Sequence, residues 1–156
     1  MPRKGPAPRR PVVPDAKFGD TTVSNVINKV MLDGKKTVAE AIVYEAMDIA
    51  AQKTGNEPLA CLLNAIEAVK PAVEVKSRRV GGATYQVPIE VSDRRQHSLG
   101  VRWLVEFSRK RSEHTMAQRL GNEMADSVSE RGGAFKKRDE THRMAEANKA
   151  FSHFRW

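Results

Sequence analysis

The side chains most able to act on a ligand in this sequence are lysines and arginines, which gather in short clusters. The chain has 27 of them against 19 aspartates and glutamates, a formal net charge of +8. One such cluster is usually only a solvated face, but six of them favour a partner that carries phosphate. The clusters are Arg3, Lys4, Arg9 and Arg10; Lys35 and Lys36; Lys76, Arg78 and Arg79; Arg94 and Arg95; Arg109, Lys110 and Arg111; and Lys136, Lys137 and Arg138.

Residue types that catalyse reactions are present, but they lack the spacing that a reaction needs. The four histidines are scattered, and neither a Ser-His-Asp motif nor a phosphate-binding P-loop occurs. His142 and Glu146 lie four apart on an expected helix, a spacing that suits a metal. No third ligand is evident, so a surface ion pair is the simpler interpretation. We predict no enzyme, no metal or cofactor, and no small-molecule substrate.

Cysteine content and hydropathy indicate a cytosolic class of protein. The single cysteine, Cys61, excludes an intrachain disulfide and a cysteine-based zinc finger, and its apolar setting favours a small buried side chain. The longest apolar run, residues 59–63, is too short for a membrane span. A chain of 156 residues fits one domain with a core. We expect a cytoplasmic protein without a membrane partner.

Helical periodicity surrounds one region with strand periodicity. Residues 1–19 are rich in proline and positive charge, and we expect them to form a basic arm without a core of its own. Apolar residues spaced three and four apart then predict six helices. Their expected starts are near Asp20, Thr37, Pro58, Asp93, Thr115 and Phe135. The prediction is a mainly α protein, with residues 20–156 as one six-helix body and a protruding β-hairpin at about 73–91 between the third and fourth helices.

The hairpin centres on Gly81 and Gly82. A three-residue loop, 80–82 or 81–83, would place Val73 and Val75 on the same face as Tyr85 and the other apolar residues of the second arm. A two-residue loop would mix apolar and polar side chains, so we predict the three-residue loop. The basic tip would then reach beyond the body, and the glycines would let its backbone approach a ligand closely.

Sequence-specific readout has no visible signature. Aromatic residues are 6% of the chain and follow no base-stacking strand pattern, and no zinc-finger or leucine-zipper spacing occurs. This favours a structural protein that recognises the shape and backbone of a folded RNA. The alternative is an architectural DNA-binding protein that inserts its basic ribbon in a groove. An enzyme acting on RNA has the least support.

Several longer stretches resemble the family of bacterial small-subunit ribosomal protein S seven. They are VEVKSRRVGGATYQVP at residues 73–88, DGKK at 33–36, Arg102 with Trp103, and HRMAEANKAF at 142–151 followed by Arg155 and Trp156. The resemblance covers nearly the whole chain from about Phe18. It implies a helical body with a protruding ribbon and a structural role without catalysis.

The resemblance also implies partners and site residues. The expected role is that of a primary binder of 16S rRNA, in its 3′ major domain, which nucleates assembly of the subunit head. The hairpin would reach the exit-site tRNA and the mRNA path, and ribosomal proteins S nine and S eleven would be neighbours. The expected rRNA-binding residues are the first five clusters above together with Arg102. The expected hairpin contacts are Arg78, Arg79, Gly81, Gly82 and Tyr85, and a secondary basic cluster comprises Lys136, Lys137, Arg138 and Arg143.

Overall fold

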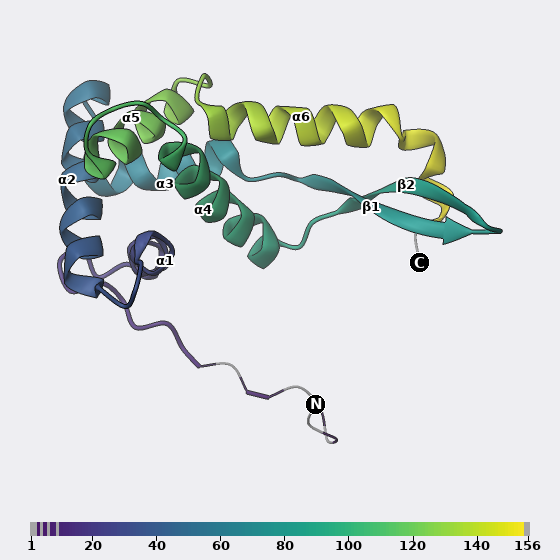
Figure 1. Cartoon of the computed structure of the whole chain (residues 1–156), viewed down its shortest axis with the longest axis horizontal. Helices are drawn as coiled ribbons and strands as arrows, with labels where there is room; N and C mark the ends of the chain where they lie inside the picture. The colour runs from purple at the N-terminus through teal and green to yellow at the C-terminus, as the bar shows by residue number, and fades with distance from the viewer. Residues whose placement is uncertain (1–2, 4, 6, 9, 155–156) are drawn as a thin grey trace.

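The structure, a computed structural model, describes residues 3, 5, 7, 8 and 10–154. Its elements are α1 (Thr21–Val30), α2 (Lys36–Thr54), α3 (Pro58–Val69), β1 (Val73–Val80), β2 (Ala83–Glu90), α4 (Asp93–Arg109), α5 (Met116–Val128), α6 (Gly133–Ala147) and the 3₁₀ helix η1 (Lys149–Phe154). Helices α1 to α5 form a body from which α6 and the hairpin project together (Figure 1). The predicted fold class is confirmed, and η1 is an addition to it. No helix in the described ranges is long and apolar enough to cross a membrane.

Several helix ends follow the local signals of the sequence. The Asp20 side chain accepts a hydrogen bond from the Thr22 amide and caps α1. Gly55 ends α2 in the left-handed region, with a φ of 71°, and Pro58 occupies the first turn of α3. These three ends are confirmed because each depends on one residue and its immediate neighbours.

Helix α2 begins at Lys36, one residue before the start expected near Thr37. Its N-cap is Lys35, which makes no side-chain capping hydrogen bond, so Thr37 and Glu40 lie inside the helix. The preceding turn determines this start, because Asp33 and Gly34 have φ angles of 52° and 72° and reverse the chain directly before Lys35. Thr37 is therefore the second helical residue and does not cap the helix.

The predicted cap of α4 is also displaced by one residue. Ser92 is the N-cap, and Asp93 is the first helical residue, where its negative charge still lies at the positive end of the helix dipole. The predicted start of α5 at Thr115 is confirmed. Thr115 and Gln118 each bond the other's backbone in a capping box.

Helix α5 packs against α2 at very short range. A Cβ on Gly121 would lie 2.8 Å from the Ala46 carbonyl oxygen and 2.9 Å from the Ile49 Cβ, so glycine is needed at this crossing. Cys61 is buried as predicted, and burial raises the pKa of its thiol. Large buried side chains from all five helices of the body fill the core: Val23, Ile27, Val43, Met47, Leu62, Ile66, Leu104, Leu120 and Met124.

The hairpin turns through two residues, so the predicted three-residue loop is wrong. Gly81 and Gly82 have φ angles of 57° and 88°. Two successive positive φ angles produce a turn whose twist matches that of the flanking strands. This match outweighs the separation of apolar from polar side chains, and Lys76 therefore lies directly opposite Val87 on one face of the ribbon.

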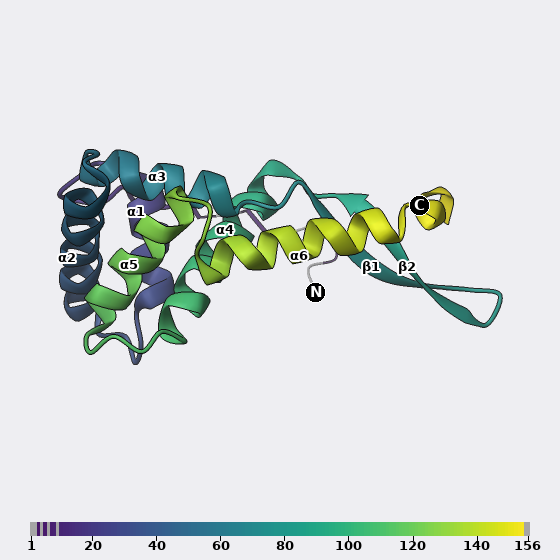
Figure 2. The same cartoon turned by 90° about the horizontal axis from the view of Figure 1, so that it is seen from above.

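Helix α6 and η1 run beside the hairpin and brace it, while its tip extends past them (Figures 1 and 2). Tyr85 packs against Phe151 and Phe154 of η1, with ring centroids 5.2 and 5.0 Å away. At the base, His142 Nε2 accepts a hydrogen bond from the Ala72 amide at 3.0 Å. A lone two-stranded ribbon is marginal in water, so the C-terminal helices supply the packing surface that it needs.

A partly buried ion-pair cluster joins α4, α5 and α6. The Glu123 side chain is 1% exposed, and its Oε2 lies 2.8 Å from Arg111 Nη1. Its other oxygen accepts a hydrogen bond from the Ala134 amide at 2.8 Å, in the first turn of α6. Arg111 also pairs with Glu113 and Asp126, each at 2.8 Å. Glu123 thus caps α6, while the end of α4 neutralises its charge.

Replacing Arg111 with Met should lower the free energy of unfolding by about 3 kcal/mol, because the buried Glu123 carboxylate loses its counterion. Urea denaturation followed by circular dichroism measures this loss. The matched control is Lys110→Met at the neighbouring position, whose exposed pair with Glu106 should contribute less than about 1 kcal/mol. Equal losses in the two variants would contradict the structural role of the cluster.

Candidate nucleic-acid interface

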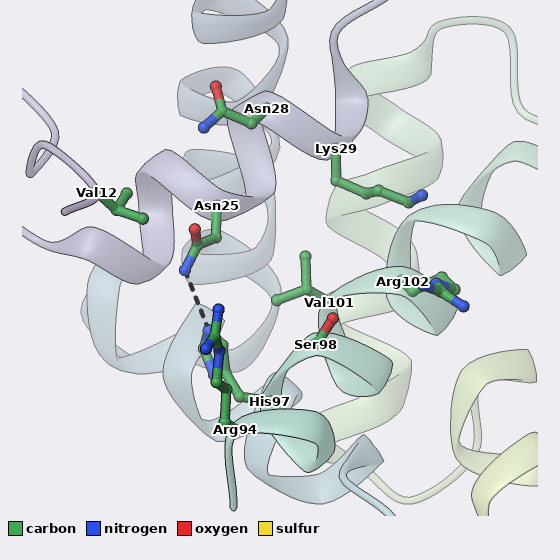
Figure 3. Close-up of a pocket in the computed structure, with 9 residues that line it drawn as sticks. All are labelled: Val12, Asn25, Asn28, Lys29, Arg94, His97, Ser98, Val101 and Arg102. Carbon is green, nitrogen blue, oxygen red and sulfur yellow. Dashed lines mark hydrogen bonds between the residues drawn. The ribbon is translucent and has the colours of Figure 1, made fainter. Parts of the chain in front are cut away.

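A hollow of about 420 Å³ lies between α1 and α4 (Figure 3). We call it the α1–α4 groove. Three of its lining side chains are cationic, four are uncharged polar groups, and no carboxylate lines it within the described residues. The lining consists of Val12, Asn25, Asn28, Lys29, Arg94, His97, Ser98, Val101 and Arg102.

Helix geometry positions the cations of this groove. Arg94 and Arg102 lie eight residues apart on α4, so two helical turns place them on one face. Lys29 lies in the last turn of α1, where a positive charge also interacts with the helix dipole. All three side chains are exposed, and in the part of the chain that the structure describes none of them forms an ion pair. Their charges are therefore available to an anionic ligand.

Uncharged polar groups line the groove together with the cations. Asn25 Nδ2 lies 3.5 Å from His97 Nε2, and the two side chains point toward each other across the helices (Figure 3). Burial lowers the pKa of His97, and the positive charge of Lys70 lowers it further. The imidazole is thus neutral at pH 7. Cations together with uncharged hydrogen-bonding groups fit phosphate and sugar groups of a nucleic acid backbone.

The N-terminal arm meets this groove. Val12 belongs to the lining, and the Val13 carbonyl accepts a hydrogen bond of 2.8 Å from Ser24 Oγ on α1. Arg3 and Arg10 are exposed. The predicted contacts Lys4 and Arg9 lie outside the described residues.

Some predicted phosphate-binding cations are held by protein groups. Arg95 makes a bidentate pair with Glu74, with N–O distances of 2.8 to 3.1 Å. That arginine lowers the pKa of the Glu74 carboxyl against the opposing effect of burial, which is the larger single influence. The same carboxylate lies 3.5 Å from Lys76 Nζ. The base of the hairpin is therefore joined to α4 by charge.

The basic cluster at the end of α4, residues 109–111, makes the most contacts with other groups of the protein. Arg109 Nη2 donates to the Lys29 and Val30 carbonyls at 3.3 Å, which satisfies the end of α1. Lys110 pairs with Glu106 at 3.0 Å. Arg111 is enclosed by carboxylates and lowers the pKa of Glu113 to about 2. Arg111 acts as a structural residue, and we leave it out of the phosphate-binding set.

The remaining predicted cations lie at the turn before α2 and on the hairpin. Lys35 and Lys36 are exposed at the turn before α2, with only a 3.8 Å contact from Lys36 to Glu40. On the hairpin, Arg78 lies opposite Tyr85 and Arg79 opposite Thr84, next to Gly81 and Gly82.

The secondary basic cluster on α6 is mostly paired. Lys137 lies 2.8 Å from Glu140, and Arg143 lies 2.8 Å from Asp139. Arg138 donates to the Ala68 carbonyl at 2.7 Å, which attaches α6 to α3. Lys136 is exposed. Most of this cluster contributes to helix stability and packing rather than to a free cationic surface.

Four residues that line the groove were not predicted from the sequence: Lys29, Asn25, Asn28 and His97. Lys29 is a single cation, so it escapes a search for clusters, although it falls on the polar face of the expected first helix. The uncharged members carry no sequence signal of binding. Among the described residues no group of three or more potential ligands could hold a metal.

The His97 pKa should lie below 6.5 when measured by NMR titration, because burial disfavours the imidazolium. The unfolded chain then takes up the proton first as the pH falls. The contribution of His97 to the free energy of unfolding is therefore complete above about pH 6.5 and declines below that pH. The loss of stability between pH 7.5 and pH 5.5 should be smaller in His97→Gln than in the parent. His142 accounts for part of the remaining loss, because burial and then the charge of Arg138 lower its pKa as well. A His97 pKa above 6.5 would contradict this environment.

Comparison with known proteins agrees with the geometry. Residues 2–149 match the model of the family described as ribosomal protein S7p/S5e. Three relatives named small ribosomal subunit protein uS7, from Rhodococcus opacus, Rhodospirillum rubrum and Streptomyces coelicolor, are 57%, 59% and 58% identical over 156 residues, 100% of both chains in each case. The chain therefore belongs to the ribosomal protein S7p/S5e family, whose members are structural proteins and not enzymes.

Proposed function

We propose that this protein is a structural component of the small ribosomal subunit that binds 16S rRNA and nucleates assembly of the subunit head. The observation that carries the proposal is the α1–α4 groove, in which Lys29, Arg94 and Arg102 face solvent without a carboxylate among the lining residues. The rRNA segment is the 3′ major domain. By neutralising phosphates of several RNA segments, the protein lets helices pack that would otherwise repel each other.

The hairpin extends the proposal to a second RNA surface. It reaches the exit-site tRNA and the mRNA path through Arg78, Arg79, Tyr85 and the backbone of its glycine turn. Two features support this: the ribbon projects well beyond the helical body, and α6 and η1 hold it in place (Figure 2). A braced arm loses little conformational entropy when it binds.

The opposite part of the body suits protein neighbours. Glu45 and Asp48 are exposed on α2, in a chain whose overall net charge is +8. A negative helix face attracts basic proteins and repels RNA. Ribosomal proteins S nine and S eleven are the proposed neighbours, and the ribosome in the cytoplasm is the proposed location.

Replacing Arg94 and Arg102 together with Ala should weaken binding to the 3′ major domain of 16S rRNA. Two lost phosphate contacts reduce the slope of log K against log salt by about 1.5 and the affinity at 0.1 M salt by roughly tenfold. Filter binding over a range of salt concentrations measures both quantities.

The matched control for this experiment is Lys53→Ala with Arg131→Ala, which removes two charges from a different hollow that also contains Asp126. The control should keep the parental salt slope. Equal losses in the two double variants would mean that net charge alone determines binding, and the groove would lose its assigned role.

Changing Lys76, Arg78 and Arg79 to Ala should leave the circular dichroism spectrum intact, because these side chains lie outside the core. RNA affinity and salt slope should fall through the lost contacts of the ribbon. Parental values for both quantities would count against rRNA binding by the ribbon and would restrict it to the tRNA side.

A further inference from the structure

A buried carboxylate lies near the base of the basic N-terminal arm. Asp15 is only 7% exposed. Its Oδ1 accepts a hydrogen bond from the Tyr44 hydroxyl at 2.7 Å, and its Oδ2 accepts the amides of Lys17 and Phe18 at 3.0 Å each. Both oxygens are therefore satisfied within the chain, and the arm is attached to α2 through Tyr44.

Aromatic and cationic groups enclose this attachment. The Phe18 ring packs on Tyr44 with centroids 5.9 Å apart, and Lys17 Nζ lies 5.2 and 5.0 Å from the two ring centres. Burial alone would raise the pKa of Asp15, but the hydrogen bonds from Tyr44 and the two amides outweigh it and lower the pKa. The same contact raises the pKa of Tyr44 to about 12. The carboxylate is thus charged and the phenol protonated throughout the neutral range.

The loop closed by Asp15 determines where the arm goes. The Asp15 amide donates to the Asp20 carbonyl at 3.1 Å, and the Gly19 amide donates back to the Asp15 carbonyl at 2.8 Å. Followed backwards from Asp15, the arm therefore leaves the loop beside the start of α1. It then lies along α1, where Ser24 bonds the Val13 carbonyl and Val12 enters the lining of the α1–α4 groove.

We infer that Asp15 is a positioning residue for RNA binding: held by Tyr44, it places the N-terminal arm across the α1–α4 groove, so that the arm and the groove bind one phosphate backbone together. The inference rests on the proposed function. Asp15 itself makes no contact with the RNA.

This assignment predicts an effect opposite in sign to simple electrostatics. Removing a negative charge from an RNA-binding protein ordinarily strengthens binding. Here the Asp15→Asn side chain cannot accept hydrogen bonds with both of its terminal atoms. The change therefore releases the arm and should weaken RNA binding. The arm carries Arg3, Lys4, Arg9 and Arg10, and its contacts are lost first. Tyr44→Phe removes the same hydrogen bond without a change in charge and should weaken binding in the same direction.

The test measures affinity for the 3′ major domain of 16S rRNA, and its salt slope, in the full chain. Asp15→Asn should lower the affinity about tenfold at 0.1 M salt and the slope by about 1 to 2, the effect of one or two lost phosphate contacts. The charge-matched control is Asp48→Asn on the exposed face of α2, which should bind as tightly as the parent or slightly more tightly.

A second background separates positioning from a general effect on folding. In a chain with Arg3→Ala, Lys4→Ala, Arg9→Ala and Arg10→Ala, the Asp15→Asn change should cost no further affinity. Equal losses in both backgrounds would overturn the inference, because Asp15 would then support the body and not the arm. Parental affinity in Asp15→Asn would overturn it as well. Absence of RNA binding by the parent would instead reject the proposed function, and the inference with it.

Trypsin cleavage after Lys17 gives a readout that needs no RNA. Releasing the Asp15 loop should expose this bond, so cleavage should be several times faster in Asp15→Asn and in Tyr44→Phe than in Asp48→Asn. Unchanged cleavage rates in both loop variants would show that the contact does not hold the arm, whatever the RNA result.

Discussion

The buried carboxylate of Glu123 is the constraint on which the arrangement of this molecule depends. One of its oxygens caps α6 at Ala134, and the other pairs with Arg111 at the end of α4. A buried charge without a partner costs several kcal/mol, so α4, α5 and α6 have to meet at this point. Because α6 starts there and runs beside the hairpin, the same contact sets the line along which the ribbon leaves the body (Figure 2).

Cations in this chain have two kinds of role, which can be distinguished by the groups that each cation contacts. Arg95, Arg109 and Arg111 bond carboxylates or backbone carbonyls of other elements and hold those elements together. Lys29 and Arg94 instead face an open groove that has no carboxylate among its described lining residues. The distinction matters for recognition, since a guanidinium already bonded by a bidentate carboxylate has few donors left for phosphate. A positive net charge therefore overstates the surface that is available to RNA.

Local signals in the sequence predict much of the fold, but they do not predict which cations bond protein groups and which face the groove. Asp20, Gly55 and Pro58 mark helix ends correctly because capping depends on a few neighbouring residues. The partners of Arg111 lie up to 15 residues away, and those of Arg138 and Tyr85 about 70, so tertiary packing decides them. The prediction of the hairpin loop fails for a different reason, because the backbone twist at two glycines takes precedence over the alternation of side chains.

In the proposed function, the groove and the arm together hold an RNA backbone in one orientation. A freely moving arm would lose conformational freedom on binding, at roughly 1 to 2 kcal/mol for each residue that becomes fixed. Segment 12–18 is already placed by Asp15, Ser24 and Tyr44, so this loss occurs during folding of the protein. Most of the arm's charge is carried by the residues that precede this segment in the sequence. In the proposed role of Asp15, preorganisation of the arm's base directs those charges to the groove, and the acidic residue itself does not touch the RNA.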